Sequence, residues 1–327
     1  MHPIDLVVLW VDSNDKEWQT EKAKYTGGGD DRIIRYRDWD LMRYWFRAAE
    51  ECLPFIRKIH FITFGHIPSW LNTENEKLNI VKHSDFIPGE YLPTFNSNVI
   101  ELNLHRIEDL SEHFILCNDD FFFLQQKPAE FFFKNGKPCD FAIQNVLQFH
   151  KSGGIGHITA NNLEVLNKEF SKRAVMKNNF SKWFNIKYGL KAFYNLYLLS
   201  FSNFTGFIDP HLAYSHLKSS FAEMWEKYPD MMDKLSRTKI RSNDDINHWL
   251  IRYRNLAKGN FTPTNTNRGE FLIIGEDDKK IEKILLKRSV PLICLSDDYE
   301  NIDFEKEKEF LKSLFEKIYP NESHFER

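Results

Sequence analysis

Apolar residues follow two alternating patterns along the first half of the chain. Short continuous runs such as "IDLVVLWV" are typical of strands buried on both faces of a parallel sheet, whereas "RDWDLMRYWFRAAEECL" repeats apolar residues at helical spacing. The pattern predicts strands at 4–11, 56–64, 78–83 and 113–124 and helices at 37–53 and 94–107. This alternation indicates an α/β fold with a mostly parallel sheet, which binds ligands beyond the carboxyl ends of its strands.

Helical patterns dominate after residue 150. One helix is expected within 209–229 and another within 242–259, because each segment carries an apolar stripe at helical spacing. The expected boundary residues are Asp209 and Pro210 for the first helix and Ser242, Asn243 and Gly259 for the second.

Two further segments complete the pattern. The charged, amphipathic stretch 304–320 predicts a peripheral helix, and the polar stretch 14–31, which contains three consecutive glycines, predicts a loop. We expect an α/β core at 1–150, a helical part at 151–262 that completes the site, and a C-terminal tail with a peripheral helix at 263–327.

Composition narrows the range of functions. The net charge of −3 argues against a general nucleic-acid binder, which would carry a basic face. The four cysteines are scattered without a Cys/His cluster, so neither a zinc site nor a disulfide framework is expected. No signal peptide is expected, and the apolar stretch "LKAFYNLYLLSFSNFTGF" contains too many polar residues to span a bilayer. A soluble protein is expected, and contact with a membrane surface stays open.

Two adjacent carboxylates, Asp119 and Asp120, stand between the apolar runs "ILC" and "FFF". The ordinary explanation is a solvated turn after a strand. Burial of two unpaired charges is costly, however, and carboxylates at a strand end suit Mg²⁺ or Mn²⁺ bridging a nucleotide diphosphate. The pair is therefore a candidate metal site.

Two cationic residues precede or open the predicted second-half helices. His211 and Arg241 would face an anion there, because helix N-termini favour negative charge. A capping role for His211 and a surface ion pair for Arg241 are the structural alternatives. Beside a diphosphate site both become candidates for phosphate contact, with His211 also a candidate acid or base.

The remaining candidates lie near the first strand and the first helices. Trp10, Val11 and Asp12 end the first predicted strand, where an indole can pack on a base and a carboxylate can accept a ribose hydroxyl. Arg37, Asp38 and Arg43, at the start of the next helix, are candidates for nucleotide or phosphate binding beside that strand, with ordinary capping and helix-face charge as the alternative. Asn96 and Asn98, at the start of the helix expected at 94–107, would reach the same cleft.

Four blocks of the sequence resemble the Stealth family of bacterial capsular-polysaccharide hexose-1-phosphate transferases. These enzymes are related to the lysosomal-enzyme N-acetylglucosamine-1-phosphotransferase. The similar blocks are "IDLVVLWVDSND", the stretch from "RDWDLMRYWF" to "ILCNDDFFF", "DPHLAYSHLKSSFAEMWEKYP" and "KIRSNDDINHWL". The resemblance implies a fold like that of the glycosyltransferase-A enzymes, which bind nucleotide sugars, with the donor and metal bound in residues 1–150. It also implies that Asp119, Asp120, His211 and Arg241 occupy catalytic positions.

The resemblance further implies transfer of a sugar-1-phosphate from a UDP-sugar to a hydroxyl of a growing capsular polysaccharide or exopolysaccharide, with release of UMP. The acceptor would be a glycan, with a lipid-linked one left open, in the cytoplasm or at the inner face of the membrane. Asp38 and His211 are the candidate general bases. Two alternatives remain: a metal-dependent glycosyltransferase that releases UDP, and a non-catalytic sugar-binding scaffold of a polysaccharide assembly complex.

Overall fold

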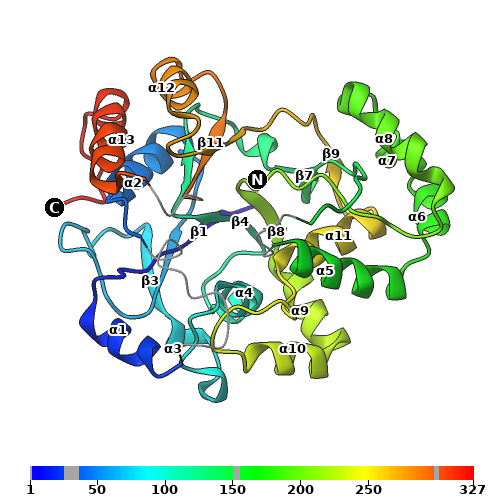
Figure 1. The fold of residues 1–327 in the computed structure, drawn as a ribbon, viewed down its shortest axis with the longest axis horizontal. Helices are drawn as coiled ribbons and strands as arrows, with labels where there is room; N and C mark the ends of the chain where they lie inside the picture. The colour runs from blue at the N-terminus through cyan, green and yellow to red at the C-terminus, as the bar shows by residue number, and fades with distance from the viewer. Residues whose placement is uncertain (1, 26–36, 150–154, 298–301) are drawn as a thin grey trace.

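The computed structural model describes residues 2–25, 37–149, 155–297 and 302–327, so the three consecutive glycines at 27–29 lie outside the described residues. Its centre is a five-stranded sheet with the strand order β3-β2-β1-β4-β8 (Figure 1). These strands are β1 (Ile4–Leu9), β2 (Ile59–Thr63), β3 (Leu78–Lys82), β4 (His113–Asn118) and β8 (Tyr214–Leu217). The first four are parallel and β8 is antiparallel to β4, which confirms the predicted α/β fold with a mostly parallel sheet.

Consecutive side chains of β1 enter two different apolar cores. Leu6 and Val8 pack in one cluster and Val7 packs in the other, because neighbouring residues of a strand point to opposite faces. The first cluster contains residues of α2 (Met42–Cys52), α12 (Asp278–Lys287) and α13 (Phe304–Ile318). The second contains residues of α4 (Ser97–Leu102), α5 (Ile155–Glu169), α6 (Lys172–Asn178), α9 (Lys218–Lys227), α10 (Pro229–Ser236) and α11 (His248–Lys258). The sheet is therefore covered by helices on both faces (Figure 1).

Two small sheets flank the central one. In the first, β11 (Leu292–Ser296) pairs with β10 (Glu270–Ile273) and with β5 (Phe121–Phe123). The second consists of β6 (Phe133–Lys134), β7 (Lys137–Asp140) and β9 (Thr262–Pro263). The single strand predicted at 113–124 is thus wrong in one respect: it is two strands, β4 and β5, in different sheets. Strands from beyond residues 150 and 262 join these sheets, and the proposed division of the chain at those residues stays a prediction.

The segment 14–31 was predicted to be a loop, but part of it forms α1 (Lys16–Ala23). The Asp15 carboxylate accepts a hydrogen bond from the backbone N–H of Trp18 at 2.7 Å, which caps the helix. Trp18 is the one buried residue of this helix, so the sequence lacks the apolar stripe by which longer helices are recognised.

Both predicted N-termini in the second half are wrong. The stretch after Asp209 first forms β8, and α9 begins only at Lys218, so Asp209 and Pro210 do not start a helix. Likewise α11 begins at His248, where the Asn247 side chain accepts from the backbone N–H of Trp249 at 3.2 Å. The end of α11 at Gly259 is confirmed, with a φ of 69° that favours glycine.

The remaining helices are short or peripheral. They are α3 (His83–Phe86), α7 (Phe180–Trp183) and α8 (Ala192–Tyr197). The predicted helix at 304–320 is confirmed as α13, which lies at one edge of the fold and buries Leu311, Leu314 and Phe315 (Figure 1). Among the described residues, no helix is both long enough and apolar enough to cross a membrane.

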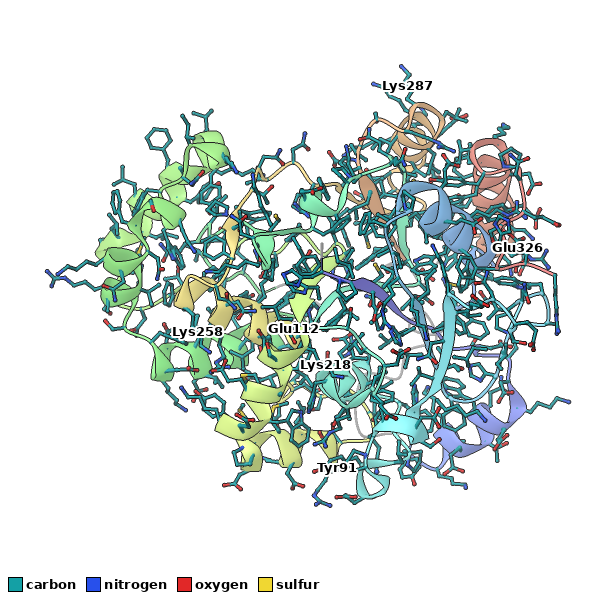
Figure 2. All side chains as sticks on the ribbon, turned by 180° about the vertical axis from the view of Figure 1, so that it is seen from behind. Tyr91, Glu112, Lys218, Lys258, Lys287 and Glu326 are labelled. Atoms are coloured by element: carbon teal, nitrogen blue, oxygen red, sulfur yellow. The ribbon has the colours of Figure 1, made fainter. Side chains whose placement is uncertain are left out.

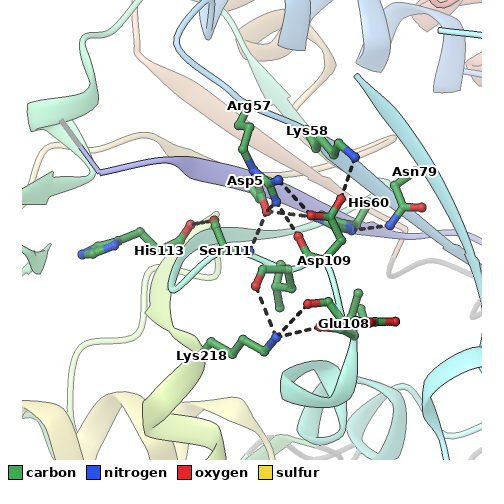
Figure 3. A network of polar contacts seen from close by, with 12 residues as sticks. Asp5, Arg57, Lys58, His60, Asn79, Glu108, Asp109, Ser111, His113 and Lys218 are labelled. Carbon is green, nitrogen blue, oxygen red and sulfur yellow. Dashed lines mark hydrogen bonds and ion pairs between the residues drawn. The ribbon is translucent and has the colours of Figure 1, made fainter. Parts of the chain in front are cut away.

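A network of charged residues closes the amino edge of the central sheet (Figure 3). Asp5 is fully buried near the start of β1 and accepts hydrogen bonds from Arg57 Nε at 2.8 Å and Nη2 at 2.6 Å. His60 Nε2 lies 3.0 Å from Oδ2 of Asp5, and the backbone N–H of Ser111 donates to the same oxygen at 2.7 Å. Arg57 also donates to the half-exposed Asp109 at 2.9 Å. This network ties the loops before β2 and β4 to β1.

Candidate active site

The main cleft lies at the opposite, carboxyl edge of the sheet and has a volume of about 340 Å³. It is lined by residues that follow β1 and β4, by the first turns of α4 and α11, and by the loop that carries His211. The position agrees with the rule that parallel sheets bind ligands beyond the carboxyl ends of their strands. Nine of the predicted site residues line it: Trp10, Val11, Arg37, Asp38, Asn98, Asp119, Asp120, His211 and Arg241.

Asp119 and Asp120 form the turn that joins β4 to β5. Asn118 still pairs with Leu9 in the central sheet, whereas Phe121 already pairs with Cys294 in the second sheet. The backbone N–H of Leu295 donates to the carbonyl of Asp120 at 2.9 Å, which fixes the turn against β11. The two carboxylates are therefore held at a junction between two sheets and are not buried inside a strand.

Three side chains from distant parts of the chain meet beside this turn. One ligand atom each from Asp120, His211 and Cys294 lie within 4.8 Å of one another. The thiol of Cys294 donates to Oδ2 of Asp120 at 3.4 Å. Cys294 has no histidine or cysteine near it in the sequence, and the pairing of β5 with β11 brings it close to His211.

The donor set has a mixed chemical character. Carboxylate oxygens suit Mg²⁺ or Mn²⁺, whereas imidazole and thiolate also suit softer ions such as Zn²⁺. Cys294 is fully buried and its thiol is hydrogen-bonded to Asp120. The side chains of this turn that suit a hard cation are the carboxylates. Asp119 belongs to the same turn as Asp120, but it is not one of the three clustered residues.

Negative charge accumulates on the cleft side of the turn. The Asp119 carboxylate is accessible from the cleft, yet protein encloses it, and this enclosure together with the nearby Asp38 raises the pKa of Asp119 to about 6. Burial also raises the pKa of Asp38, although the backbone N–H of Asp40 donates to its carboxylate at 2.8 Å. Two neighbouring carboxylates with raised pKa values favour a bound cation.

His211 is held in the cleft by a loop with unusual backbone geometry. Its φ of 45° is in the left-handed region, which non-glycine residues rarely adopt. Its ring packs edge-on against Phe121 and Trp249, with ring centroids 5.5 and 6.1 Å away. Two residues earlier, Asp209 accepts hydrogen bonds at 2.5 Å from both Arg252 and Tyr253 of α11. These contacts position the loop that presents the imidazole.

Arg241 approaches the cleft from the loop before α11. Its Nη2 donates to the hydroxyl of Ser97 in the first turn of α4. The loop is held by the fully buried Asp245, whose Oδ2 accepts from Asn96 at 2.8 Å and from Asn98 at 3.0 Å. These contacts fix the position of the Arg241 guanidinium. The helix predicted to start at residue 242 begins instead at His248.

Three predicted site residues are not in the lining of the cleft. Asp12 accepts from the backbone N–H of Asn14 at 2.9 Å, as in an ordinary turn. The guanidinium of Arg43 lies over the ring of Trp70 at 5.2 Å. Asn96 is fully buried and caps α4. Their proposed contacts with a nucleotide stay predictions, and so does base packing by Trp10, whose ring is largely buried against Phe61.

The structure adds three cleft residues that the sequence interpretation missed: Glu101, His248 and Trp249. Glu101 on α4 is 6% exposed, and burial raises its pKa to about 7 although the nearby Arg241 opposes this. His248 Nε2 lies 4.0 Å from its carboxylate. Among the described residues, the indole Nε1 of Trp249 is buried without a hydrogen-bond partner. A glutamate within the apolar run "VIEL" was the available signal for Glu101.

Comparison with known proteins supports the resemblance found in the sequence. The family descriptions "Stealth protein CR1, conserved region 1" and "Stealth protein CR2, conserved region 2" match residues 2–30 and 35–140. A relative from Streptococcus pneumoniae named "Capsular polysaccharide phosphotransferase WcwK" is 42% identical, over 99% of both chains. The chain belongs to the Stealth family.

Other relatives of this Stealth protein are also similar over nearly their whole length. The "Exopolysaccharide phosphotransferase cps2G" of Lactiplantibacillus plantarum is 35% identical, over 99% of this chain and 96% of the relative. The "Receptor polysaccharide phosphotransferase WefC" of Streptococcus oralis is 34% identical over both complete chains.

Among solved structures, the galactosyltransferase LgtC is 10% identical with a TM-score of 0.37, over 94% of this chain and 95% of that chain. A TM-score this low carries no inference about fold or function.

Proposed function

We propose that this Stealth protein is a polysaccharide phosphotransferase that moves a sugar-1-phosphate from a UDP-sugar to a hydroxyl of a growing capsular polysaccharide or exopolysaccharide. The observation that carries the proposal is the meeting of Asp119, Asp120, His211 and Arg241 in one cleft. Carboxylates and fixed cations in one cleft suit a nucleotide diphosphate with a divalent ion. The phosphotransferase names of the relatives support the same reaction class.

The carboxylates of Asp119 and Asp120 would hold a Mg²⁺ or Mn²⁺ ion. The ion would neutralise charge on the diphosphate of the donor. The raised pKa of Asp119 supports this assignment, because a bound cation relieves the repulsion between Asp119 and Asp38. Trp10, Val11, Arg37 and Asn98 line the same cleft and are the proposed nucleotide contacts.

In the proposed reaction the acceptor hydroxyl attacks the phosphorus next to the sugar, the bond to the UMP oxygen breaks, and a phosphodiester forms. Arg241, fixed by Ser97, would stabilise charge on the transferring phosphoryl group. Glu101 is our first candidate for the base that takes the acceptor proton, because a base with a pKa near 7 is effective at neutral pH. Asp38 stays an alternative base, and His211 would bind phosphate or assist proton transfer.

The acceptor in this proposal is a glycan, and a lipid-linked glycan is included in that class. We propose a cytoplasmic site of action. Contact with the inner face of the membrane is compatible with either acceptor.

The leaving nucleotide tests the proposal directly. Purified protein is incubated with a panel of UDP-sugars, a glycan acceptor, and Mn²⁺ or Mg²⁺, and nucleotides and products are identified by mass spectrometry. We expect UMP in a one-to-one ratio with a phosphodiester-linked product. Stoichiometric UDP with no phosphorus in the glycan would establish a glycosyltransferase instead. Donor binding without metal-dependent turnover would establish a binding module.

Matched variants test the carboxylate turn. Asp120→Asn and Asp119→Asn should each reduce metal-dependent turnover sharply, whereas Asp230→Asn, on an exposed part of α10, should not. Saturating Mn²⁺ with UDP should raise the Tm of the unmodified protein, because ligands that bind only the folded state stabilise it. Near-normal turnover of Asp120→Asn at limiting metal would remove that residue from the metal site.

A further inference from the structure

One surface of the protein exposes an unusual amount of apolar side chain. Nine of the fifteen large apolar side chains that are exposed among the described residues lie in the segment 180–201. Single apolar residues scattered over a surface are normal in soluble proteins, whereas a concentration of them in one segment marks an interaction site. Ile186, Leu190 and Tyr197 are 94%, 83% and 76% exposed. The segment comprises α7, a 3₁₀ helix at Ile186–Lys191, α8 and a 3₁₀ turn at Leu198–Ser200, and Figure 1 shows α7 and α8 at the periphery.

The segment is held in this orientation by buried anchors on its inner side. Trp183 and Asn195 are fully buried, and the Asn195 amide donates to the carbonyls of Ala142 and Trp183 at 2.7 Å. Its Oδ1 accepts from the backbone N–H of Gln144 at 2.8 Å. In α8 the amide therefore faces inward while Phe193 and Tyr197 face outward, the reverse of an ordinary surface helix.

The charge of this region points to the kind of partner. The chain has 47 acidic and 44 basic residues, yet residues 170–208 contain no aspartate or glutamate. The basic residues of the same stretch are Lys172, Arg173, Lys177, Lys182, Lys187 and Lys191. Lys172, Lys182 and Lys187 donate to backbone carbonyls, and Lys187 is also exposed. Arg173, Lys177 and Lys191 are exposed as well. The surface is therefore both apolar and cationic.

We propose that the segment 180–201 docks the protein on an anionic phospholipid bilayer. Exposed aromatic and aliphatic side chains beside lysines are characteristic of elements that lie in the interface of a membrane, where the lysines contact anionic headgroups. A second copy of the same surface is a poorer partner, because two cationic surfaces repel each other. The proposal is independent of the reaction assigned to the cleft.

Vesicle flotation tests this surface with the full chain. The protein is mixed with phosphatidylcholine vesicles containing no phosphatidylglycerol or about one-third phosphatidylglycerol, at low and high salt. We expect flotation with the anionic vesicles and its loss at high salt. Lys187→Glu and Lys191→Glu should each reduce the partition coefficient at least about fivefold, since one basic residue near an anionic surface contributes about 1 kcal/mol. Leu190→Ser with Tyr197→Ser should reduce it further.

Matched controls come from α12 at the other side of the fold. Leu286 is an exposed leucine and Lys287 projects into solvent (Figure 2), so Leu286→Ser and Lys287→Glu should leave flotation unchanged. Circular dichroism and Tm confirm that each variant is folded. Absence of flotation, or equal flotation of surface variants and controls, would overturn the proposal. A concentration-dependent dimer that Leu190→Ser abolishes, without vesicle binding, would assign the surface to a second copy instead.

Discussion

Asp5→Asn should destabilise the protein by about 3 kcal/mol at pH 7 without changing the cleft. Asp5 is fully buried and accepts from two nitrogens of Arg57, from His60 and from the backbone N–H of Ser111. Breaking a buried ion pair costs about 3–5 kcal/mol. The low end applies here because Arg57 is 34% exposed and can recover contact with water once its partner is neutral.

The lowered pKa of Asp5 determines how the destabilisation by Asp5→Asn should change with pH. Burial by itself would raise the pKa of Asp5, but hydrogen bonds from His60, Arg57 and Ser111 outweigh it and hold that pKa well below its ordinary value. The folded state therefore loses the stabilisation as pH falls below the unfolded pKa of about 4, by up to about 1.4 kcal/mol per pH unit. The stability difference between the native protein and Asp5→Asn should be constant from pH 7 to 5 and about 1 kcal/mol smaller at pH 3.

Urea denaturation followed by circular dichroism measures both quantities. Asp109→Asn is the matched control in the same network (Figure 3), because Asp109 is 46% exposed and its ion pairs with Arg57 and Lys58 should contribute less than about 1 kcal/mol. Equal destabilisation by the two variants would refute the reasoning. So would an Asp5→Asn effect that is the same at pH 3 and pH 7.

The remaining predictions concern the cleft and the loops that support it. Glu101→Gln should abolish most turnover and remove a rise of kcat/KM with pH centred near 7, because the carboxylate is the active form and its pKa in the free protein is about 7; an unchanged profile of kcat/KM against pH would exclude it as the base. Arg241→Lys should lower kcat about 10²-fold or more in steady-state assays, since lysine keeps the charge but loses the planar fork, and near-normal kcat would return Arg241 to a structural role. Arg252→Lys should lower the free energy of unfolding in urea by about 2 kcal/mol, because the buried Arg252 donates to Asp140 and Asp209 together, and an unchanged midpoint would contradict this.

The sequence predicted the central sheet because β1, β2 and β4 are short, mostly apolar segments, whose signal needs no tertiary information. Nine of the twelve residues predicted for the site line the cleft, since the residues after parallel strands meet at one edge of the sheet. The sequence alone did not predict that Cys294 lies close to His211. That contact depends on the pairing of β5 with β11, strands about 170 residues apart in the chain.

The predicted helix N-termini in the second half of the chain are wrong for a different reason. Asp209 followed by proline has the local signature of a helix start, yet Arg252 and Tyr253 bind its carboxylate instead. Local capping preference is worth about 1 kcal/mol, less than a buried, charge-assisted hydrogen-bond network. A tertiary contact of this kind overrides the local signal.

The placement of charge at the two ends of β1 has a practical consequence for protein engineering. The Asp5 network and the cleft are separated by the length of the strand, about 13 Å from Asp5 to Leu9 at the usual rise per residue. Between them the strand is packed on both faces. Substitutions that strengthen the amino edge can therefore be combined with redesign of the cleft for other donors, and their effects on Tm and on turnover should add.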